Sequence, residues 1–167
     1  MKAIVAMDPN RVIGCEGKIP WHYTEDMKWF KEFTMGRTLV MGWNTYQSLP
    51  VKLKGRKICV LSREWTPSLA FSHEPKADDV YFRYPPTRKD PSVMDVFDPT
   101  EWSDAIVTGG AKTYILLLPH ITEMYVTHIA KDYEGDTYMP EFENQFSHIE
   151  TIRESNDFSI IKYTRGV

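Results

Sequence analysis

The sequence predicts a single α/β domain over residues 1–167, with a central, mainly parallel sheet, an antiparallel C-terminal edge strand and helices on both faces. Three observations predict this class. Apolar runs alternate with helical patterns through most of the chain, as in parallel sheets. Two further runs follow each other near the C-terminus without a helix between them, which indicates an antiparallel pair. The length of 167 residues is that of one domain, and no linker or repeat divides it.

The first elements follow from an apolar run and from turn residues. The run 4–7 predicts a buried strand that ends at a Pro-Asn turn. Residues 12–21 carry two glycines and a proline and are expected to form a shaped loop. A helix is predicted from Thr24, a good N-cap followed by two acids, to Gly36, because apolar residues recur at helical spacing between them.

The remaining elements alternate along the chain. Strands are predicted where short apolar runs lie between turn residues: 39–41, 56–62, 80–84, 105–108 and 124–129. Short helices at 44–49 and 111–118 should each stop before a proline. The stretch 72–100 is expected to be mostly loop, with one helical turn at 92–97. The last two apolar runs should form the closing antiparallel pair: 146–153 and 158–164.

Composition and charge exclude several classes of protein. With 20 basic and 23 acidic residues the formal net charge is −3, which leaves no large positive field for a nucleic acid or an anionic membrane. No apolar run approaches the roughly 20 residues that cross a bilayer, and the N-terminal run is too short for a signal peptide. Cys15 and Cys59 cannot form a disulfide framework, which favours a reducing, cytoplasmic location. The 5 histidines lack metal-ligand spacing, so no metal site is predicted.

Asp26 is an acid on an otherwise apolar helix face, which it shares with Trp29 and Phe30. One interpretation is an exposed acid in the first turn, where the helix dipole favours negative charge. The other is a pocket carboxylate whose two oxygens accept hydrogen bonds from two adjacent donors on a heterocycle. Position alone leaves both open.

Two strand ends have the residues to hold a nucleotide. Gly109 and Gly110 lie between a buried strand and a helix, which places backbone N–H groups at the carboxyl edge of the sheet. The pattern is not G-x-G-x-x-G, and a tight strand-to-helix turn explains it equally well. Another strand ends at Leu61, Ser62 and Arg63, with a hydroxyl beside a guanidinium. This pair could bind a phosphate monoester, or it could simply be the solvated end of a strand.

A series of motifs follows in chain order: Val12-Ile13-Gly14, Ile19-Pro20-Trp21, Asp26-Met27-Lys28-Trp29-Phe30-Lys31, Met41-Gly42-Trp43-Asn44-Thr45-Tyr46, Gly55-Arg56-Lys57, Leu61-Ser62-Arg63, Gly109-Gly110-Ala111-Lys112-Thr113-Tyr114, Tyr125-Val126-Thr127-His128-Ile129 and Glu134-Gly135-Asp136-Thr137. Together these motifs resemble the dihydrofolate reductase family. They extend from Ala3 to the last strand, and only residues 72–104 lack a recognisable motif. Because so many spaced motifs occur together, the resemblance is specific, and it implies a dihydrofolate reductase-like fold.

The resemblance implies transfer of a hydride from NADPH to 7,8-dihydrofolate, giving tetrahydrofolate. Asp26 would hold the amide and 2-amino edge of the pterin, supported by Thr127, and Trp21 would complete the catalytic set. The implied substrate site also contains Val5, Met27, Phe30, Leu49, Leu53, Thr108 and Arg56, the last on the glutamate α-carboxylate. The implied cofactor site contains Ala6, Ile13, Ile19, Gly42, Trp43, Asn44, Thr45, Leu61, Ser62, Arg63, Gly109, Gly110, Ala111, Lys112, Thr113 and Tyr114. Ile19 and Trp21 would belong to a mobile loop that closes over the nicotinamide. Gly109-Gly110 resembles the family's cis Gly-Gly bond.

Two positions depart from the family pattern. Trp43 stands where many relatives carry Arg or Lys near the cofactor's 2′-phosphate, so more of the binding of that phosphate should fall to Ser62 and Arg63. Thr108 stands where relatives usually carry Ile or Val against the substrate. A hydroxyl on that wall should weaken the family's usual antifolate inhibitors without removing the activity.

Two other functions are compatible with the same fold. One is a pyrimidine reductase of riboflavin synthesis, against which Asp26 behind Ile19-Pro20-Trp21 argues. The other is a non-catalytic nucleotide-binding module, against which the joint presence of Asp26, Arg56 and Thr127 argues. The expectation is a monomeric cytoplasmic enzyme whose partner is dihydrofolate, with no nucleic acid, membrane or metal.

Overall fold

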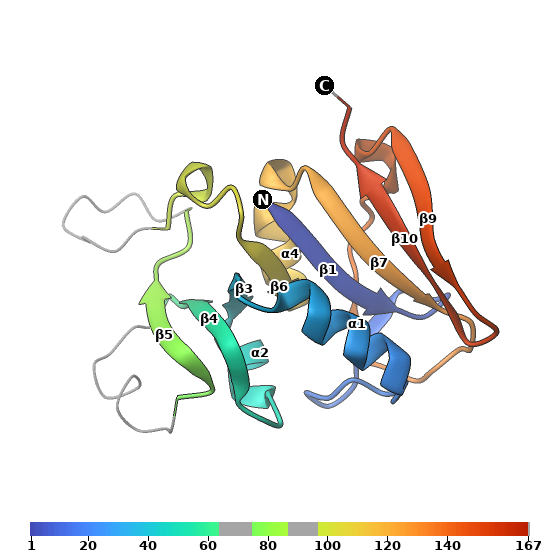
Figure 1. The fold of residues 1–167 in the computed structure, drawn as a ribbon, viewed down its shortest axis with the longest axis horizontal. Coiled ribbons are helices and arrows are strands. Elements are labelled where there is room, and N and C mark those ends of the chain that lie inside the picture. Colours follow the sequence, from blue (N-terminus) through green and yellow to red (C-terminus); the bar gives the residue numbers. More distant parts are fainter. Residues whose placement is uncertain (64–74, 87–96, 167) are drawn as a thin grey trace.

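The computed structural model describes residues 1–63, 75–86 and 97–166, and the central feature of this part of the chain is an eight-stranded sheet (Figure 1). Its strands are β1 (Lys2–Met7), β3 (Thr38–Gly42), β4 (Leu53–Leu61), β5 (Ala77–Arg83), β6 (Ile106–Gly109), β7 (Glu123–Ile129), β9 (His148–Glu154) and β10 (Phe158–Thr164). Their order in the sheet is β5-β4-β3-β6-β1-β7-β10-β9. Neighbouring strands from β5 to β7 are parallel, whereas β10 is antiparallel to both β7 and β9. The predicted parallel sheet with an antiparallel C-terminal edge is confirmed.

The helices cover both faces of this sheet, as predicted. They are α1 (Thr24–Thr34), α2 (Trp43–Ser48) and α4 (Ala111–Leu117), with short 3-10 turns η1 (Pro99–Glu101), η2 (Leu118–His120) and η3 (Glu143–Gln145). The connection from β1 to β3 through α1 moves toward β5, whereas the connection from β6 to β7 through α4 moves toward β9. Because such crossovers are right-handed, the two helices must lie on opposite faces. Figure 1 shows α1 in front of the sheet and α4 behind it.

Successive residues of the central strands alternate between two apolar cores. The α1-face core contains Ile4, Leu39, Met41, Tyr46, Leu53, Ile58, Val60, Ile106 and Tyr125, with Trp29, Phe30 and Phe33 of α1 packed against it. The α4-face core includes Ala3, Val5, Met7, Val40, Cys59, Val107, Val126, Tyr114 and Leu117. Since side chains alternate along a strand, Thr108 and Thr127 face α1, two positions after Ile106 and Tyr125.

Some local expectations are wrong. A second sheet of two strands, β2 (Val12–Gly14) and β8 (Thr137–Tyr138), lies where the sequence predicted only loop at 12–14. Its two strands are far apart in the chain, so local turn signals do not reveal the pairing. The residue that precedes α1 is Tyr23 rather than Thr24, and no side chain caps the helix. The helical turn predicted at 92–97 lies outside the described residues except for Phe97, which is buried.

Candidate active site

The carboxyl ends of β1 and β6 form the point where neighbouring connections leave toward opposite faces of the sheet. Open α/β sheets bind ligands in the crevice that this divergence creates. The strand register aligns four pairs along this edge: Leu61 with Gly42, Met41 with Gly109, Ala6 with Thr127, and Met7 with His128. Residues singled out on separate strands in the sequence therefore lie along one edge.

Asp26 and Thr127 meet at this edge although they are 101 positions apart in the chain. Asp26 lies half-buried in the first turn of α1, and Thr127 in β7 is 1% exposed. The Thr127 hydroxyl donates a hydrogen bond of 2.6 Å to Asp26 Oδ1. Burial raises the pKa of Asp26 above its usual value, and the hydrogen bond from Thr127 acts in the opposite direction. Asp26 is thus a desolvated carboxylate rather than an exposed first-turn acid.

The apolar residues predicted around Asp26 divide between the two faces of the sheet. Phe30 and Leu49 are partly buried against the α1-face core, and Leu53 is buried in it. Met27, the residue after Asp26, is 53% exposed, so its side chain is open to solvent and available to a ligand. Val5 instead packs in the α4-face core. Its side chain therefore lies on the face opposite Asp26, and only its backbone can serve this site.

Arg56 lies at the other end of α1. It is 6% exposed; Nη1 donates to Thr34 Oγ1 over 3.2 Å, and Nε donates to the Lys54 carbonyl over 3.1 Å. Thr34 comes eight positions after Asp26 in the same helix, which is about 12 Å along the axis. A carboxylate thus lies in the first turn of α1, and a guanidinium from β4 lies against its last turn. An elongated ligand with an amide-like head and an acidic tail requires such a separation of charges.

The strand-to-helix turn after β6 lies very close to the start of α2. The Gly109–Gly110 peptide bond is cis. A Cβ at Gly42 would lie 2.9 Å from Thr113 Oγ1, and one at Gly110 would lie 3.1 Å from Thr45 Oγ1. A side chain at either position would crowd a threonine hydroxyl of the facing segment, so the two glycines favour this close approach.

Tyr114, predicted to bind the cofactor, is buried, and its hydroxyl donates to the Ile4 carbonyl over 2.7 Å. Burial raises the pKa of this phenol. This hydrogen bond links α4 to β1, so the Tyr114 side chain has a structural role in the fold.

The ends of β4 and β5 lie side by side next to the start of α2. The Ser62 N–H donates to the Arg83 carbonyl over 3.1 Å, Ser62 is buried, and Arg63 is exposed. Trp43 is half-buried and stacks on Tyr46, with a centroid distance of 5.8 Å. Asn44 and Lys112 are exposed, and Ala111 is half-buried at the start of α4.

The segment between β1 and α1 leaves the carboxyl end of β1 and packs against the segment that follows β7. Trp21 is buried and its ring lies 5.2 Å from that of Tyr133, whereas Ile19 is 64% exposed. Ile13 packs against the α4-face core. The Glu16 N–H donates to Asp136 Oδ2 over 2.9 Å, which holds this segment on the one that follows β7.

Thr34 and Tyr133 contact residues of the site and were not found from the sequence. Thr34 is a threonine at a helix end, and Tyr133 follows a strand in a polar turn; no local pattern distinguishes either. In the described ranges, no group of His, Cys, Asp and Glu side chains could hold a metal ion, and no helix is long and apolar enough to span a membrane.

Comparisons with known proteins identify the family. The family model described as dihydrofolate reductase matches residues 1–165. The dihydrofolate reductase of Bacillus subtilis is 32% identical over 84% of this chain and 75% of its own length, and that of Haemophilus influenzae is 30% identical over 93% and 91%. A structure of Enterococcus faecalis dihydrofolate reductase, complexed with NADP(H) and RAB-propyl, superposes with a TM-score of 0.67 at 26% identity and covers 99% of this chain and 96% of that one.

These matches decide among the three functions that share the fold. The family model and the curated relatives agree over nearly the whole chain, and the neighbouring structure agrees in fold. The chain therefore belongs to the dihydrofolate reductase family, whose members use NADPH to reduce dihydrofolate to tetrahydrofolate.

Proposed function

We propose that Asp26, supported by Thr127, is the group that holds the pterin of dihydrofolate and favours its protonation at N5. The observation that supports this role is the 2.6 Å bond from the Thr127 hydroxyl to a half-buried carboxylate. One carboxylate oxygen is engaged by Thr127, and both can accept from the adjacent donors on the pterin edge. Partial desolvation strengthens the attraction between the carboxylate and a pterin that gains positive charge.

The chain's own residues then have distinct tasks in the reaction. NADPH supplies the hydride when it is bound. Asp26 stabilises the pterin that is protonated at N5, and Met27, Phe30 and Leu49 flank its rings. Because these flanking side chains have no proton to give, we assign the N5 proton to a water molecule. Ile19 and Trp21 exclude other water from the path of the hydride.

Arg56 is the proposed partner of the substrate's α-carboxylate. It bonds to Thr34, which lies about 12 Å from Asp26 along the axis of α1, and this separation fits a substrate whose acidic tail extends away from the pterin. Thr34 and the Lys54 carbonyl fix two of the guanidinium's N–H groups. A guanidinium held in this way loses little side-chain entropy when it binds a carboxylate.

The residues at the sheet edge fit NADPH. Gly42 and Gly110 leave the backbone bare beside the hydroxyls of Thr113 and Thr45, and Gly109 adds to this bare backbone, which suits a diphosphate. Ser62 and Arg63 are proposed for the 2′-phosphate, with Trp43 and Thr45 along the nucleotide. Ala6 and Ile13 are proposed to contact the carboxamide through their backbones.

We also propose that residues 1–167 act as one domain and as a cytoplasmic monomer that does not bind nucleic acid. The net charge of −3 disfavours nucleic acid. Cys59 is a buried free thiol, and burial raises its pKa to about 12, which is compatible with a reducing compartment.

Two substrates test the proposed binding mode. Arg56→Leu should lower kcat/KM for dihydrofolate about 10- to 150-fold, because a lost charge-assisted pair costs about 1.5–3 kcal/mol. The same variant should keep its activity on a dihydropterin that lacks the glutamate. Arg37→Leu, which removes an exposed guanidinium at the end of the same helix, is the matched control. An equal loss on both substrates would contradict the role of Arg56, since a merely unstable enzyme loses both.

A further inference from the structure

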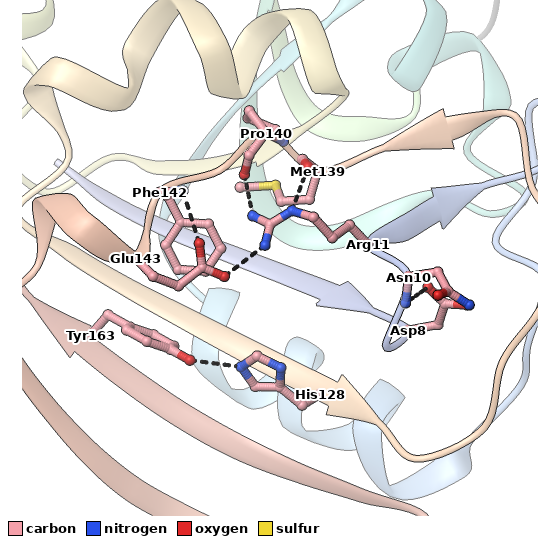
Figure 2. A network of polar contacts seen from close by, with 9 residues as sticks. All are labelled: Asp8, Asn10, Arg11, His128, Met139, Pro140, Phe142, Glu143 and Tyr163. Atoms are coloured by element: carbon pink, nitrogen blue, oxygen red, sulfur yellow. Dashed lines mark hydrogen bonds and ion pairs between the residues drawn. The ribbon is translucent and has the colours of Figure 1, made fainter.

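The segment between β1 and α1 is held on the segment that follows β7 by several polar contacts. The Tyr133 N–H donates to Asp8 Oδ2 over 2.9 Å, and the Glu16 N–H donates to Asp136. Arg11 spans the same junction: its guanidinium donates to the Met139 and Pro140 carbonyls and to Glu143, as Figure 2 shows. These contacts fix the first part of the segment.

Tyr133 fixes the last part of the segment through its side chain. Its ring lies 5.2 Å from the Trp21 ring at an angle of 57°, and its hydroxyl lies 2.8 Å from the Tyr23 hydroxyl. The Tyr23 ring in turn meets Phe158 edge-on at 6.0 Å. Tyr133 thus holds both Trp21 and the residue that precedes α1.

The contacts of Tyr133 lead directly to the proposed catalytic groups. Trp21, Tyr23 and Tyr133 belong to one apolar cluster that also includes Ala6 and Trp29, so this cluster borders the sheet edge and α1. Asp26 follows Tyr23 by less than one helical turn. Because the helical backbone between these residues is rigid, a displacement of Tyr23 should also displace Asp26.

The hydroxyl pair persists over the working range of pH. The hydrogen bond with Tyr133 is the main reason why the pKa of Tyr23 rises to about 12, and burial adds to it. The Tyr23 phenol therefore stays neutral, and the two hydroxyls can share a hydrogen bond.

We propose that Tyr133 is a positioning residue for hydride transfer, which sets the place of Trp21 through its ring and the start of α1 through its hydroxyl. This inference rests on the proposed roles of Trp21 and Asp26. Displacements of about 1 Å in the placement of reacting groups can cost on the order of 10²-fold in rate. Tyr133 touches neither reacting group, so its effect on the rate of the chemical step should exceed its effect on the binding of dihydrofolate.

Single-turnover kinetics separate these effects. Enzyme saturated with NADPH is mixed with dihydrofolate, and the loss of NADPH absorbance gives the rate of hydride transfer. Tyr133→Phe and Tyr23→Phe each remove one hydroxyl and should slow this step about 2- to 10-fold, the range for one hydrogen bond. The double variant should be no slower than either single one, because both remove the same bond. Tyr133→Leu also removes the ring and should slow the step on the order of 10²-fold.

The controls distinguish positioning from stability. Tyr138→Phe removes a hydroxyl that bonds to Gly135 on the same segment and should leave hydride transfer within about twofold of the parent enzyme. In the slowed variants, NADPH deuterated at the transferred position should give a larger isotope effect on kcat, and the KM for dihydrofolate should change less than the rate of hydride transfer.

Parent-like hydride transfer in Tyr133→Leu, or additive losses in the double variant, would overturn the proposal. A lowered melting temperature with parent-like hydride transfer would overturn it as well, because it would show a structural role alone. Asp26→Asn, measured alongside, keeps the two proposals apart: a parent-like rate in that variant removes the proposed site itself, whereas parent-like rates in the tyrosine variants alone remove only the positioning role.

Discussion

Replacing Thr108 by Ile should tighten the binding of diaminopyrimidine inhibitors such as trimethoprim, but only slightly. Thr108 lies on the α1 side of β6, directly before Gly109. Its hydroxyl donates to the Val40 carbonyl of the neighbouring strand over 3.3 Å. The hydroxyl is thus paired within the protein, and an apolar inhibitor does not have to desolvate it.

The internal bond decides the magnitude. An unpaired hydroxyl against the inhibitor would cost about 1–3 kcal/mol, and its removal would tighten binding about 5- to 150-fold. With the hydroxyl paired, the gain comes from the added methylene, about 0.8 kcal/mol, or about fourfold in the inhibition constant. Loss of the bond to Val40 should lower the free energy of unfolding by about 0.5–1.5 kcal/mol.

Inhibition constants at fixed NADPH test this reasoning, with Thr108→Val as the matched control. Val removes the hydroxyl without adding a methylene, so its inhibition constant should stay within about twofold of the parent value. The Ile variant should show the fourfold gain, and dihydrofolate should respond less because Arg56 provides it with a further contact. A gain above about tenfold in the Val variant would show that the hydroxyl is unpaired in the pocket. An unchanged or weaker constant for Ile would show that Thr108 points away from it.

Two further substitutions test the charges at either side of the site. Arg63→Leu should raise the KM for NADPH about 10- to 150-fold, and that for NADH far less, since only NADPH carries the 2′-phosphate; equal losses for both cofactors would show that Arg63 does not touch that phosphate. Asp26→Asn should stabilise the protein at pH 7: burial raises the pKa of Asp26 in the folded state, so the ionised carboxylate opposes folding, and the effect should fade as the pH drops toward the unfolded value of 3.8. Urea unfolding at several pH values measures the difference, and a variant less stable than the parent at pH 7 would contradict the desolvation of Asp26.

Elements with a local signal were predicted from the sequence. The strand expected at 105–108 and the helix expected at 111–118 agree with β6 and α4 to within about one residue, because apolar runs, glycines and a proline mark their ends. The strand β2 was not predicted, because it is stabilised by pairing with β8, a distant part of the chain. The N-cap of α1 was predicted one residue too late, at Thr24. Tyr23 holds that position without a capping hydrogen bond, and its hydroxyl instead contacts Tyr133.

Only part of the site could be predicted from the sequence, and that part depends on one charged residue among apolar neighbours. Asp26 could be singled out because an acid on an apolar helix face needs an explanation. The proximity of Thr127 came from resemblance to a family, since no spacing rule connects positions 101 residues apart. The orientation of Val5 depends on strand register, and the contacts of Tyr133 depend on how two loops pack. Neither the orientation of Val5 nor the contacts of Tyr133 can be derived from the residues next to them in the sequence.

The pH dependence of hydride transfer in Asp26→Asn tests the central claim most directly. Asn keeps the size of Asp and can still accept from Thr127, but it has no charge to stabilise the protonated pterin. Single-turnover rates should fall on the order of 10²-fold or more at pH 7 and recover in part as the pH is lowered, because dihydrofolate then reaches the site already protonated. A variant that transfers hydride at the parent rate at pH 7 would contradict the assignment of Asp26.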